Sequence, residues 1–367
     1  MLAETSAKPA KTNAPRPSPR GLVVALIPAH DEEAQIEGAI ESLREQISPP
    51  DLIIVCADNC SDRTAERAEA AGAIVFETVD NPHKKAGALN QALEILLPLL
   101  RDEDAVLVMD ADSILAPRFV ATAQRHLRDD VGGVGGVFTG RAGGGFVGML
   151  QRNEYARYAR DVARLKGKVL VLTGTATLFS ARTLRHVAWA RAEGLLPGDK
   201  PQVYDTSVLT EDNELTLALL HLGYRVISPK DCRLTTEVME SWADLYRQRL
   251  RWKRGALENL RTYGLTRVTA SYWVRQLVTF FGMLVTLLYL ASLGSSLALA
   301  GTINVQPIWL AVSGVFIAER IVTVRSRGPV QMVLAAALLV EMTFDLFLQV
   351  VHGKAIVDTL RNSERNW

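Results

Sequence analysis

The sequence predicts an α/β fold in which a mostly parallel, doubly wound sheet is followed by C-terminal transmembrane helices. Two observations support this prediction. Short apolar runs alternate with helical patterns over roughly residues 21–130, and this alternation is typical of parallel strands that helices cover on both faces. Further along, residues 276–318 contain no Asp, Glu, Lys or Arg, which is typical of membrane-spanning segments.

The elements follow one another in a regular order. Residues 1–20 carry few large apolar side chains, so we expect a disordered tail that is not a signal peptide. Apolar runs predict buried strands at residues 22–27, 52–56, 73–76, 105–109 and 169–172. Helical spacing predicts helices at residues 36–47, 61–72, 86–100, 149–165 and 210–222, and another after Pro117. Ser61 and Asp62 are the expected N-caps of the second helix.

These patterns divide the chain into five segments. After the tail we expect an α/β domain at residues 21–240 and an Arg- and aromatic-rich amphipathic segment at the membrane interface at 241–275. Two or three transmembrane helices are expected within residues 276–352, and a C-terminal tail at 353–367.

Three stretches could form the membrane spans. Residues 276–300 are long enough to cross about 30 Å of hydrocarbon, and residues 308–324 and 329–351 follow. Glu341 and Asp345 weaken the last stretch, because ionisable groups at membrane depth are costly, and we expect this helix to face protein or lie at the interface.

The distribution of arginines predicts the orientation in the membrane. Arginines precede the first stretch and lie between the second and the third, whereas the link between the first two carries no charge. By the positive-inside rule, the α/β domain is cytoplasmic in a multi-pass protein of the cell (inner or plasma) membrane. Three full spans would put the basic C-terminus outside, so the number of spans stays open.

The composition excludes several classes of protein. The 41 Lys and Arg residues balance 40 Asp and Glu residues, so no overall field favours nucleic acid as a partner. A hydrophobic fraction of 48% with 22% charged residues excludes a disordered chain and a pure membrane bundle. The three cysteines exclude a disulfide scaffold. The histidines lack the paired spacing of a zinc site. Residues 143–148 match G-x-G-x-x-G, but no second strand ending in an acid follows, as a dinucleotide site requires.

Acidic residues follow three of the predicted strands. Asp31 and Glu33 come after the first strand, Asp58 after the second, and Asp110 and Asp112 after the fourth. In an open α/β sheet, ligands bind beyond the carboxyl ends of the strands, so we expect these carboxylates along one edge. The D-A-D at residues 110–112 offers the hard oxygen ligands that suit Mg²⁺ or Mn²⁺ bound to substrate phosphates.

Taken together, the ordered motifs resemble those of the family 2 inverting glycosyltransferases, which have the GT-A fold. The likeness covers roughly residues 21–260. It rests on the opening strand and turn at 27–33, on A-D-N-C-S-D-R-T at 57–64 with Ala57 in place of the family's first Asp, on K-A-G-A-L-N at 85–90, D-A-D at 110–112, T-E-D at 210–212 and Q-R-L-R-W at 248–252. The last two motifs are similar to those of the cellulose-, chitin- and hyaluronan-synthase-like branch, in which a membrane region follows the catalytic domain.

The resemblance implies a role for each matching residue. Asp212 would be the general base that takes the proton of the acceptor hydroxyl, and Asp112 would ligate Mg²⁺ or Mn²⁺. Donor binding would fall to Ala29, Asp31, Glu33, Asp58, Lys85, Asp110 and Arg251, with Asp58 at the uridine. Acceptor binding would fall to Gly174, Thr175, Glu211, Gln248 and Trp252.

The expected function is transfer of a sugar from a nucleotide-sugar donor, expected to be a UDP-sugar, to a hydroxyl of a glycan or lipid-linked acceptor at the membrane. Such an enzyme would act in polysaccharide biosynthesis. Two alternatives stay open, namely transfer to a polyprenyl phosphate and a non-catalytic, membrane-tethered sensor or scaffold for nucleotide sugars. The sugar, the linkage, processivity and the oligomeric state also stay open.

Overall fold

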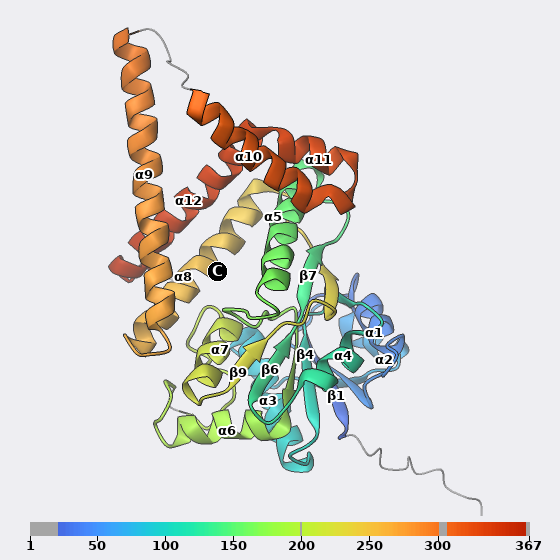
Figure 1. The fold of residues 1–367 in the computed structure, drawn as a ribbon. Helices are drawn as coiled ribbons and strands as arrows, with labels where there is room; N and C mark the ends of the chain where they lie inside the picture. Colours follow the sequence, from blue (N-terminus) through green and yellow to red (C-terminus); the bar gives the residue numbers. More distant parts are fainter. Residues whose placement is uncertain (1–20, 199, 301–306, 365–367) are drawn as a thin grey trace, which may run out of the picture.

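The computed structural model describes residues 21–198, 200–300 and 307–364. An α/β domain carries a group of long helices that rises from one end of its sheet (Figure 1). The tail expected at residues 1–20 lies outside the described residues.

The main sheet has the strand order β3-β2-β1-β4-β8-β6-β9. These strands are β1 (Val23–Ala29), β2 (Leu52–Ala57), β3 (Ile74–Glu77), β4 (Ala105–Met109), β6 (Val131–Gly135), β8 (Ala176–Ser180) and β9 (Arg225–Ile227). Strands β1 to β4 pair in parallel, as the alternation predicted, whereas β8 runs antiparallel to β4 and β6. A smaller sheet joins β5 (Ile114–Leu115), β10 (Arg233–Thr236) and β7 (Val137–Gly140). The mostly parallel α/β fold is thereby confirmed.

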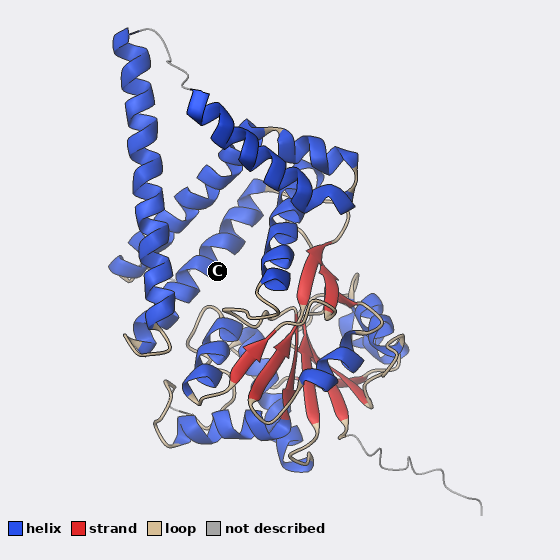
Figure 2. Ribbon diagram, in the orientation of Figure 1, coloured by secondary structure: helices blue, strands red, loops and turns tan. Residues whose placement is uncertain are grey.

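Helices cover both faces of the main sheet (Figure 2). On one face lie α1 (Ile36–Arg44), α2 (Thr64–Ala70) and α4 (Phe119–His126), and on the other α3 (Lys84–Leu96), which runs into η1 (Leu97–Leu99), α6 (Ala181–Ala192) and α7 (Glu211–His221). Alternate side chains of β1 enter the two cores, with Ala25 and Ile27 on the first side and Val24 and Leu26 on the second. This period of two is why an unbroken apolar run marks a strand that is buried on both faces.

The sequence prediction was wrong in two places within the α/β domain. Residues 169–172 do not form a strand, and the strand beside β4 is β8. Leu172 is buried, but its N–H donates to the Thr216 hydroxyl at 3.0 Å instead of joining a ladder, so the apolar run there reflects burial. The N-cap of α2 is Arg63 instead of Ser61 or Asp62, and the helix begins at Thr64. The Asp62 carboxylate accepts the Thr64 N–H at 2.9 Å from outside the helix.

The remaining helices extend from the domain. They are α5 (Gly145–Arg164), α8 (Trp242–Tyr263), α9 (Ala270–Ala300), α10 (Pro307–Val324) with η2 (Arg325–Arg327), α11 (Pro329–Ala336) and α12 (Leu338–Arg361). Helix α8 occupies most of the expected interface segment, and α12 reaches Arg361, so much of the expected C-terminal tail is helical.

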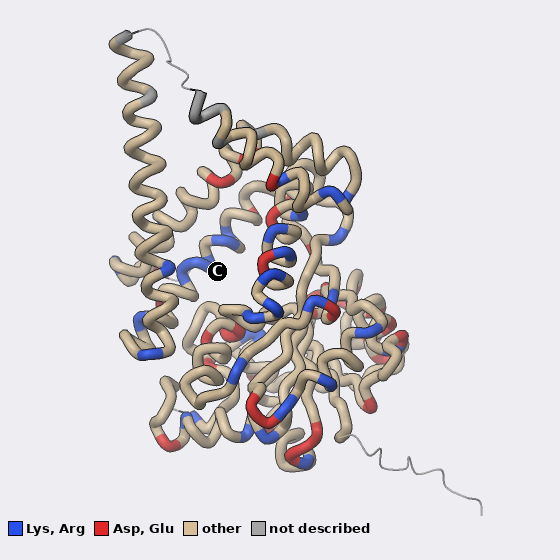
Figure 3. The backbone as a smooth tube through the Cα atoms, in the orientation of Figure 1, with Lys and Arg blue, Asp and Glu red and all other residues tan. Residues whose placement is uncertain are grey.

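Helix α9 differs from the core helix of a soluble protein. It is long and apolar enough to cross a membrane, and none of its apolar window is buried against the rest of the chain. Figure 3 shows its upper part without a charged residue. Helices α11 and α12 meet the same criterion only together, and they are bent by 72° at their break.

Charged side chains join the C-terminal helices to α5. Glu341 of α12 is 1% exposed and accepts hydrogen bonds from Arg157 at 2.7 Å and from Asn153 at 3.2 Å, both on α5. Arg320 of α10 also binds Glu341, and it reaches Asp345 at 2.7 Å. Both acids of this segment therefore face protein partners, as the cost of burying charge led us to expect.

We expect Glu341→Ala to lower the free energy of unfolding by about 1–3 kcal/mol, because Asn153, Arg157 and Arg320 would lose a buried acceptor. The two arginines would then keep only the partly exposed Asp345 as a counter-charge. The apparent melting temperature of the detergent-solubilised protein measures this effect. Glu319→Ala is the matched control, since the Glu319 side chain is 46% exposed in its ion pair with Arg160 and such pairs contribute about 0–1 kcal/mol. Equal shifts for the two variants would contradict the prediction.

Candidate active site

The K-A-G-A-L-N, D-A-D and T-E-D motifs meet at the carboxyl edge of the main sheet. Lys85 lies in the first turn of α3, Asp110 follows β4, and Glu211 opens α7. The Lys85 Nζ atom lies 2.5 Å from Asp110 Oδ1 and 3.2 Å from Glu211 Oε1. The Asp110 N–H donates to the carbonyl of Thr175 at 3.2 Å. The residues predicted from separate motifs thus form one cluster.

Asp212 is held beside this cluster by two backbone groups. Its Oδ2 atom accepts the N–H of Gly174 at 2.9 Å, and its Oδ1 atom accepts the N–H of Asn213 at 2.7 Å. A Cβ atom at position 174 would lie 2.9 Å from the Lys85 Nζ atom and 3.5 Å from the Asp212 Oδ2 atom. Glycine at this position therefore leaves room for the Lys85 ammonium, while the two backbone hydrogen bonds give Asp212 a defined orientation.

Burial and neighbouring charges set the protonation of the cluster. Burial, together with the Glu211 carboxylate, raises the pKa of Asp212 to about 6, although Lys85 opposes the shift. Burial alone would raise the pKa of Glu211 as well, but Lys85 and Arg251 outweigh it and lower that pKa. Burial disfavours the Lys85 ammonium, yet Asp110 and Glu211 raise its pKa. At neutral pH, Asp212 is thus the carboxylate of the cluster best suited to accept a proton.

A pocket opens beside Asp212, and one wall of it was not predicted. Lys85, Gly174 and Tyr204 line it together with Asp212. The amide of Asn90 holds the backbone of Tyr204, because Oδ1 accepts its N–H at 3.0 Å and Nδ2 donates to its carbonyl at 2.8 Å. The last residue of K-A-G-A-L-N thus supports the wall of the pocket.

Asp112 lies between β4 of the main sheet and β5 of the small sheet. Its two carboxylate oxygens accept the Thr236 hydroxyl at 3.3 and 3.2 Å, and Arg141 donates to its carbonyl at 2.5 Å. Burial and the nearby carboxylates of Asp112 and Glu237 raise the pKa of Glu32 to about 7. Carboxylate oxygens are the ligands that a divalent cation prefers, although among the described residues only Asp31, Cys60 and Asp62 already bring three ligand atoms within 4.8 Å of one another. Thr236 and Glu237 were missed, since no motif distinguishes the end of β10.

Asp58 is buried at the end of β2. Its N–H donates to the carbonyl of Ala29 at 2.8 Å. Its Oδ1 atom accepts hydrogen bonds from Asn59 at 3.1 Å, Thr78 at 2.8 Å and Asn81 at 2.8 Å. Because all three bonds end on Oδ1, the second oxygen, Oδ2, is the one left for a ligand in the described part of the chain.

Asp31 and Glu33 are engaged with the turn that precedes α2. The Asp31 carboxylate accepts the N–H of Ser61 at 2.6 Å and that of Asp62 at 3.2 Å, and Glu33 accepts the N–H of Arg63 at 3.2 Å. The structure therefore gives these two acids a local structural role, and their contact with a donor stays a prediction.

The Q-R-L-R-W motif lies on α8 and is tied to α5 by its second residue. Arg249 is 2% exposed, donates to Gln248 at 2.8 Å and to Glu154 at 2.7 Å, and lies 4.4 Å from the ring centroid of Trp252. Arg251, the fourth residue of the motif, instead influences α7, since its charge lowers the pKa of Glu211 on that helix. Sequence reasoning missed Arg249, because the resemblance implied roles only for Gln248, Arg251 and Trp252 of the motif.

Three comparisons relate the chain to known proteins. A family model described as "Glycosyltransferase like family 2" matches residues 19–255. The poly-β-1,6-N-acetyl-D-glucosamine synthase of Staphylococcus aureus (strain COL) is 26% identical over 283 residues, which cover 73% of this chain and 64% of that protein. The synthase of the same name from Staphylococcus epidermidis is 25% identical over 251 residues, 64% of this chain and 54% of that protein. The chain thus spans less than two thirds of the length of these relatives.

Among solved structures, a mannosyltransferase from Pyrobaculum calidifontis in complex with GDP-Man and Mn²⁺ is similar to the chain. The TM-score is 0.60 at 18% sequence identity, over 97% of this chain and 92% of that one. At this identity the likeness shows a shared fold.

Proposed function

The chain belongs to glycosyltransferase family 2 and has the GT-A fold, and on this premise we propose that it is a membrane-bound, inverting enzyme that moves a sugar from a UDP-sugar to a hydroxyl of a glycan or glycolipid. The position of Asp212 carries this proposal. Asp212, whose pKa burial raises to about 6, lines the same pocket as Lys85, and Lys85 is paired with Asp110, so that three motifs meet at this point.

In the proposed reaction Asp212 takes the proton of the acceptor hydroxyl while that oxygen forms a bond to the anomeric carbon. The bond from that carbon to the donor diphosphate breaks on the opposite side, and the diphosphate leaves with the bonding electrons. This single displacement inverts the anomeric configuration. Lys85 and Arg251 bring positive charge to the cleft that receives the diphosphate.

We propose that Asp112 holds the divalent cation, with Glu32 and Glu237 beside it. Their carboxylates supply the hard oxygen donors that Mg²⁺ and Mn²⁺ prefer. When bound, the ion supplies Lewis-acid stabilisation of the charge that builds on the departing diphosphate. The mannosyltransferase of similar fold was solved with Mn²⁺, which supports the choice of a divalent metal.

The hydrogen bonds of Asp58 favour uridine as the nucleoside of the donor. Uracil offers one N–H donor, at N3, between two carbonyl acceptors, whereas guanine presents adjacent N1–H and N2–H donors that a carboxylate binds with both oxygens. Since Oδ1 of Asp58 already accepts three bonds, Oδ2 can accept the single N–H of uracil. We therefore propose a UDP-sugar, although the mannosyltransferase of similar fold binds GDP-Man.

UDP methylated at N3 of its uracil should bind the protein roughly 10- to 100-fold more weakly than UDP, because one hydrogen bond to a charged group, about 1.5–3 kcal/mol, is lost. Competition against labelled UDP measures both affinities, and GDP is the control for a base with two adjacent donors. If methylated UDP competes as well as UDP, the placement of uracil at Asp58 is wrong.

We propose N-acetylglucosamine as the sugar to be tested first, because the curated relatives are named poly-β-1,6-N-acetyl-D-glucosamine synthases.

On the acceptor side, Trp252 is 37% exposed and offers a flat apolar face for a sugar ring. Gln248, Glu211, Gly174 and Thr175 are the proposed polar contacts of the acceptor.

For the membrane, we propose that the spans lie within residues 276–352 and that α9 is one of them. Arginines before α9 and between α10 and α11 support a catalytic domain on the cytoplasmic side, by the positive-inside rule. The donor would then reach the cleft from the cytoplasm.

The proposal is tested by UDP release from purified full-length protein. The assay uses UDP-N-acetylglucosamine and other UDP-sugars with β-linked oligosaccharides or polyprenyl phosphate, with and without EDTA, followed by mass analysis of the product. We expect EDTA-sensitive UDP release and a lengthened oligosaccharide. A sugar-phosphate lipid would instead identify a polyprenyl-phosphate transferase, and UDP binding without turnover for any acceptor would contradict the proposed transfer.

A further inference from the structure

One face of α8 lies against the first turn of α7, which carries Asp212. Gly255, Asn259 and Tyr263 follow one another at a spacing of four residues, and we call these three residues the α8 stripe. Four-residue spacing places side chains on one face of a helix. Arg251 precedes the stripe at the same spacing, and its charge lowers the pKa of Glu211.

The first two residues of the stripe hold the residue at the N-cap of α7. A Cβ atom at Gly255 would lie 2.4 Å from the hydroxyl of Thr210, so glycine allows α8 to come this close. Asn259 is 1% exposed, and its Nδ2 atom lies 3.2 Å from both the carbonyl and the hydroxyl of Thr210 and 3.0 Å from Asn213 Oδ1. Thr210 makes no side-chain capping bond within α7. Helix α8 therefore binds residues on both sides of Glu211 and Asp212.

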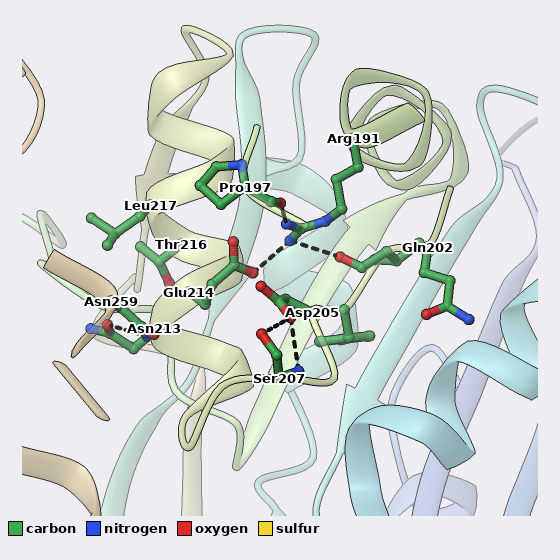
Figure 4. A network of polar contacts seen from close by, with 12 residues as sticks. Arg191, Pro197, Gln202, Asp205, Ser207, Asn213, Glu214, Thr216, Leu217 and Asn259 are labelled. Carbon is green, nitrogen blue, oxygen red and sulfur yellow. Dashed lines mark hydrogen bonds and ion pairs between the residues drawn. The ribbon is translucent and has the colours of Figure 1, made fainter. Parts of the chain in front are cut away.

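The third residue of the stripe joins a buried ion pair on α7. The Tyr263 hydroxyl donates to Glu214 Oε1 at 2.6 Å, and Arg191 of α6 donates to Glu214 Oε2 at 2.5 Å. The side chains of Arg191 and Glu214 are 1% and 2% exposed. Arg191 also donates to the carbonyls of Pro197 and Val203. Figure 4 shows Arg191 with Glu214 beside α7, and Asn259 close to Asn213.

We propose that Asn259, Tyr263 and Glu214 are positioning residues that act through α7 to hold Asp212 against the N–H of Gly174. None of the three lines the pocket beside Asp212, so they act on the reaction through the helix. A buried ion pair adds little net stability, but it can specify one arrangement of the elements it joins. The inference rests on the proposed role of Asp212 as the base. Its position matters because a displacement of about 1 Å in a reacting group can cost about 10²-fold in rate.

The position of Asp212 should also determine the pH profile of the reaction. The hydrogen bond from the Gly174 N–H stabilises the Asp212 carboxylate and thereby opposes the rise of its pKa. If α7 loses its hold, this bond weakens, and Asp212 should become protonated at a higher pH. Loss of a positioning residue should therefore lower kcat and also move the acid limb of the kcat profile upward in pH.

The test compares Tyr263→Phe and Asn259→Ala with the control Tyr158→Phe in the full-length protein. The control removes a buried hydroxyl that has no hydrogen-bond partner among the described residues. With UDP-N-acetylglucosamine as the donor, we expect kcat to fall about tenfold or more in both stripe variants. The donor KM should stay within about twofold, because the displaced group is the base, whereas the control should keep both constants and the pH profile.

The outcomes separate the two proposals. If Tyr263→Phe and Asn259→Ala keep the wild-type kcat and pH profile while Asp212→Asn is inactive, the base is right and the positioning role is wrong. A fall in kcat with an unshifted pH profile and a matching loss of melting temperature would likewise overturn positioning. An active Asp212→Asn variant would overturn both. Tyr263→Phe removes a single oxygen atom, so it decides the question if Asn259→Ala does not fold.

Discussion

An Asp212→Asn variant is expected to lose sugar transfer by a factor of roughly 10³ while its affinity for UDP stays within a few-fold of wild type. Asparagine has nearly the shape of aspartate, and its single oxygen can still accept the Gly174 N–H, although it then loses the bond from the Asn213 N–H. It cannot take a proton from the acceptor hydroxyl. Initial rates of UDP release and equilibrium binding of UDP measure the two effects separately. Transfer at the wild-type rate would show that another group is the base.

The matched control for this variant is Asp130→Asn. The Asp130 side chain is 59% exposed in an ion pair with Arg225 at the β6–β9 edge, so the same change of charge there should leave kcat unaltered. A comparable loss of activity in both variants would point to a general effect of charge and would contradict a specific role for Asp212.

The raised pKa of Asp212 gives the same assignment a pH signature. An ordinary aspartate stays ionised down to about pH 4, whereas Asp212, with a pKa of about 6, takes up its proton as the pH falls through 6. Because only the carboxylate can act as base, kcat/KM, which reports the free enzyme, should be constant near pH 7.5 and fall about tenfold for each pH unit below 6. A profile that stays flat to pH 4.5 would contradict the assignment.

The sequence predicted the parallel half of the fold because strands β1 to β4 are buried on both faces and alternate with helices. The antiparallel half was harder to predict, since burial alone does not distinguish a strand from a loop. Leu172 is as buried as a strand residue, yet its N–H binds the Thr216 hydroxyl. The short β6 and β7 segments also lie in a glycine-rich stretch, where apolar periodicity is weak.

For the site, the sequence could predict the residues that carry the chemistry but not those that support them. Lys85, Asp110 and Asp212 occupy motifs at strand or helix ends, and the structure brings them together. Asn90 and Tyr204 are 114 residues apart, and no local pattern links them. Arg249 and Asn259 likewise act on distant segments, so only the folded chain shows what they contact.

An Asp112→Ala variant should lose the metal dependence of UDP binding. Outer partners of metal ligands typically change metal affinity by about 10- to 100-fold, so a direct ligand should change it at least as much. We expect UDP to bind the variant in Mn²⁺ about as weakly as it binds wild type in EDTA. Calorimetric titration of UDP, with and without Mn²⁺, measures the difference without any need for turnover.

Asp102→Ala is the control for this change, because the Asp102 side chain is 65% exposed in an ion pair with Arg185, away from the carboxyl edge. It should keep the full response of UDP binding to Mn²⁺. If Asp112→Ala keeps that response as well, the cation binds elsewhere. The ligand atoms of Asp31, Cys60 and Asp62 lie within 4.8 Å of one another and would be the next to replace.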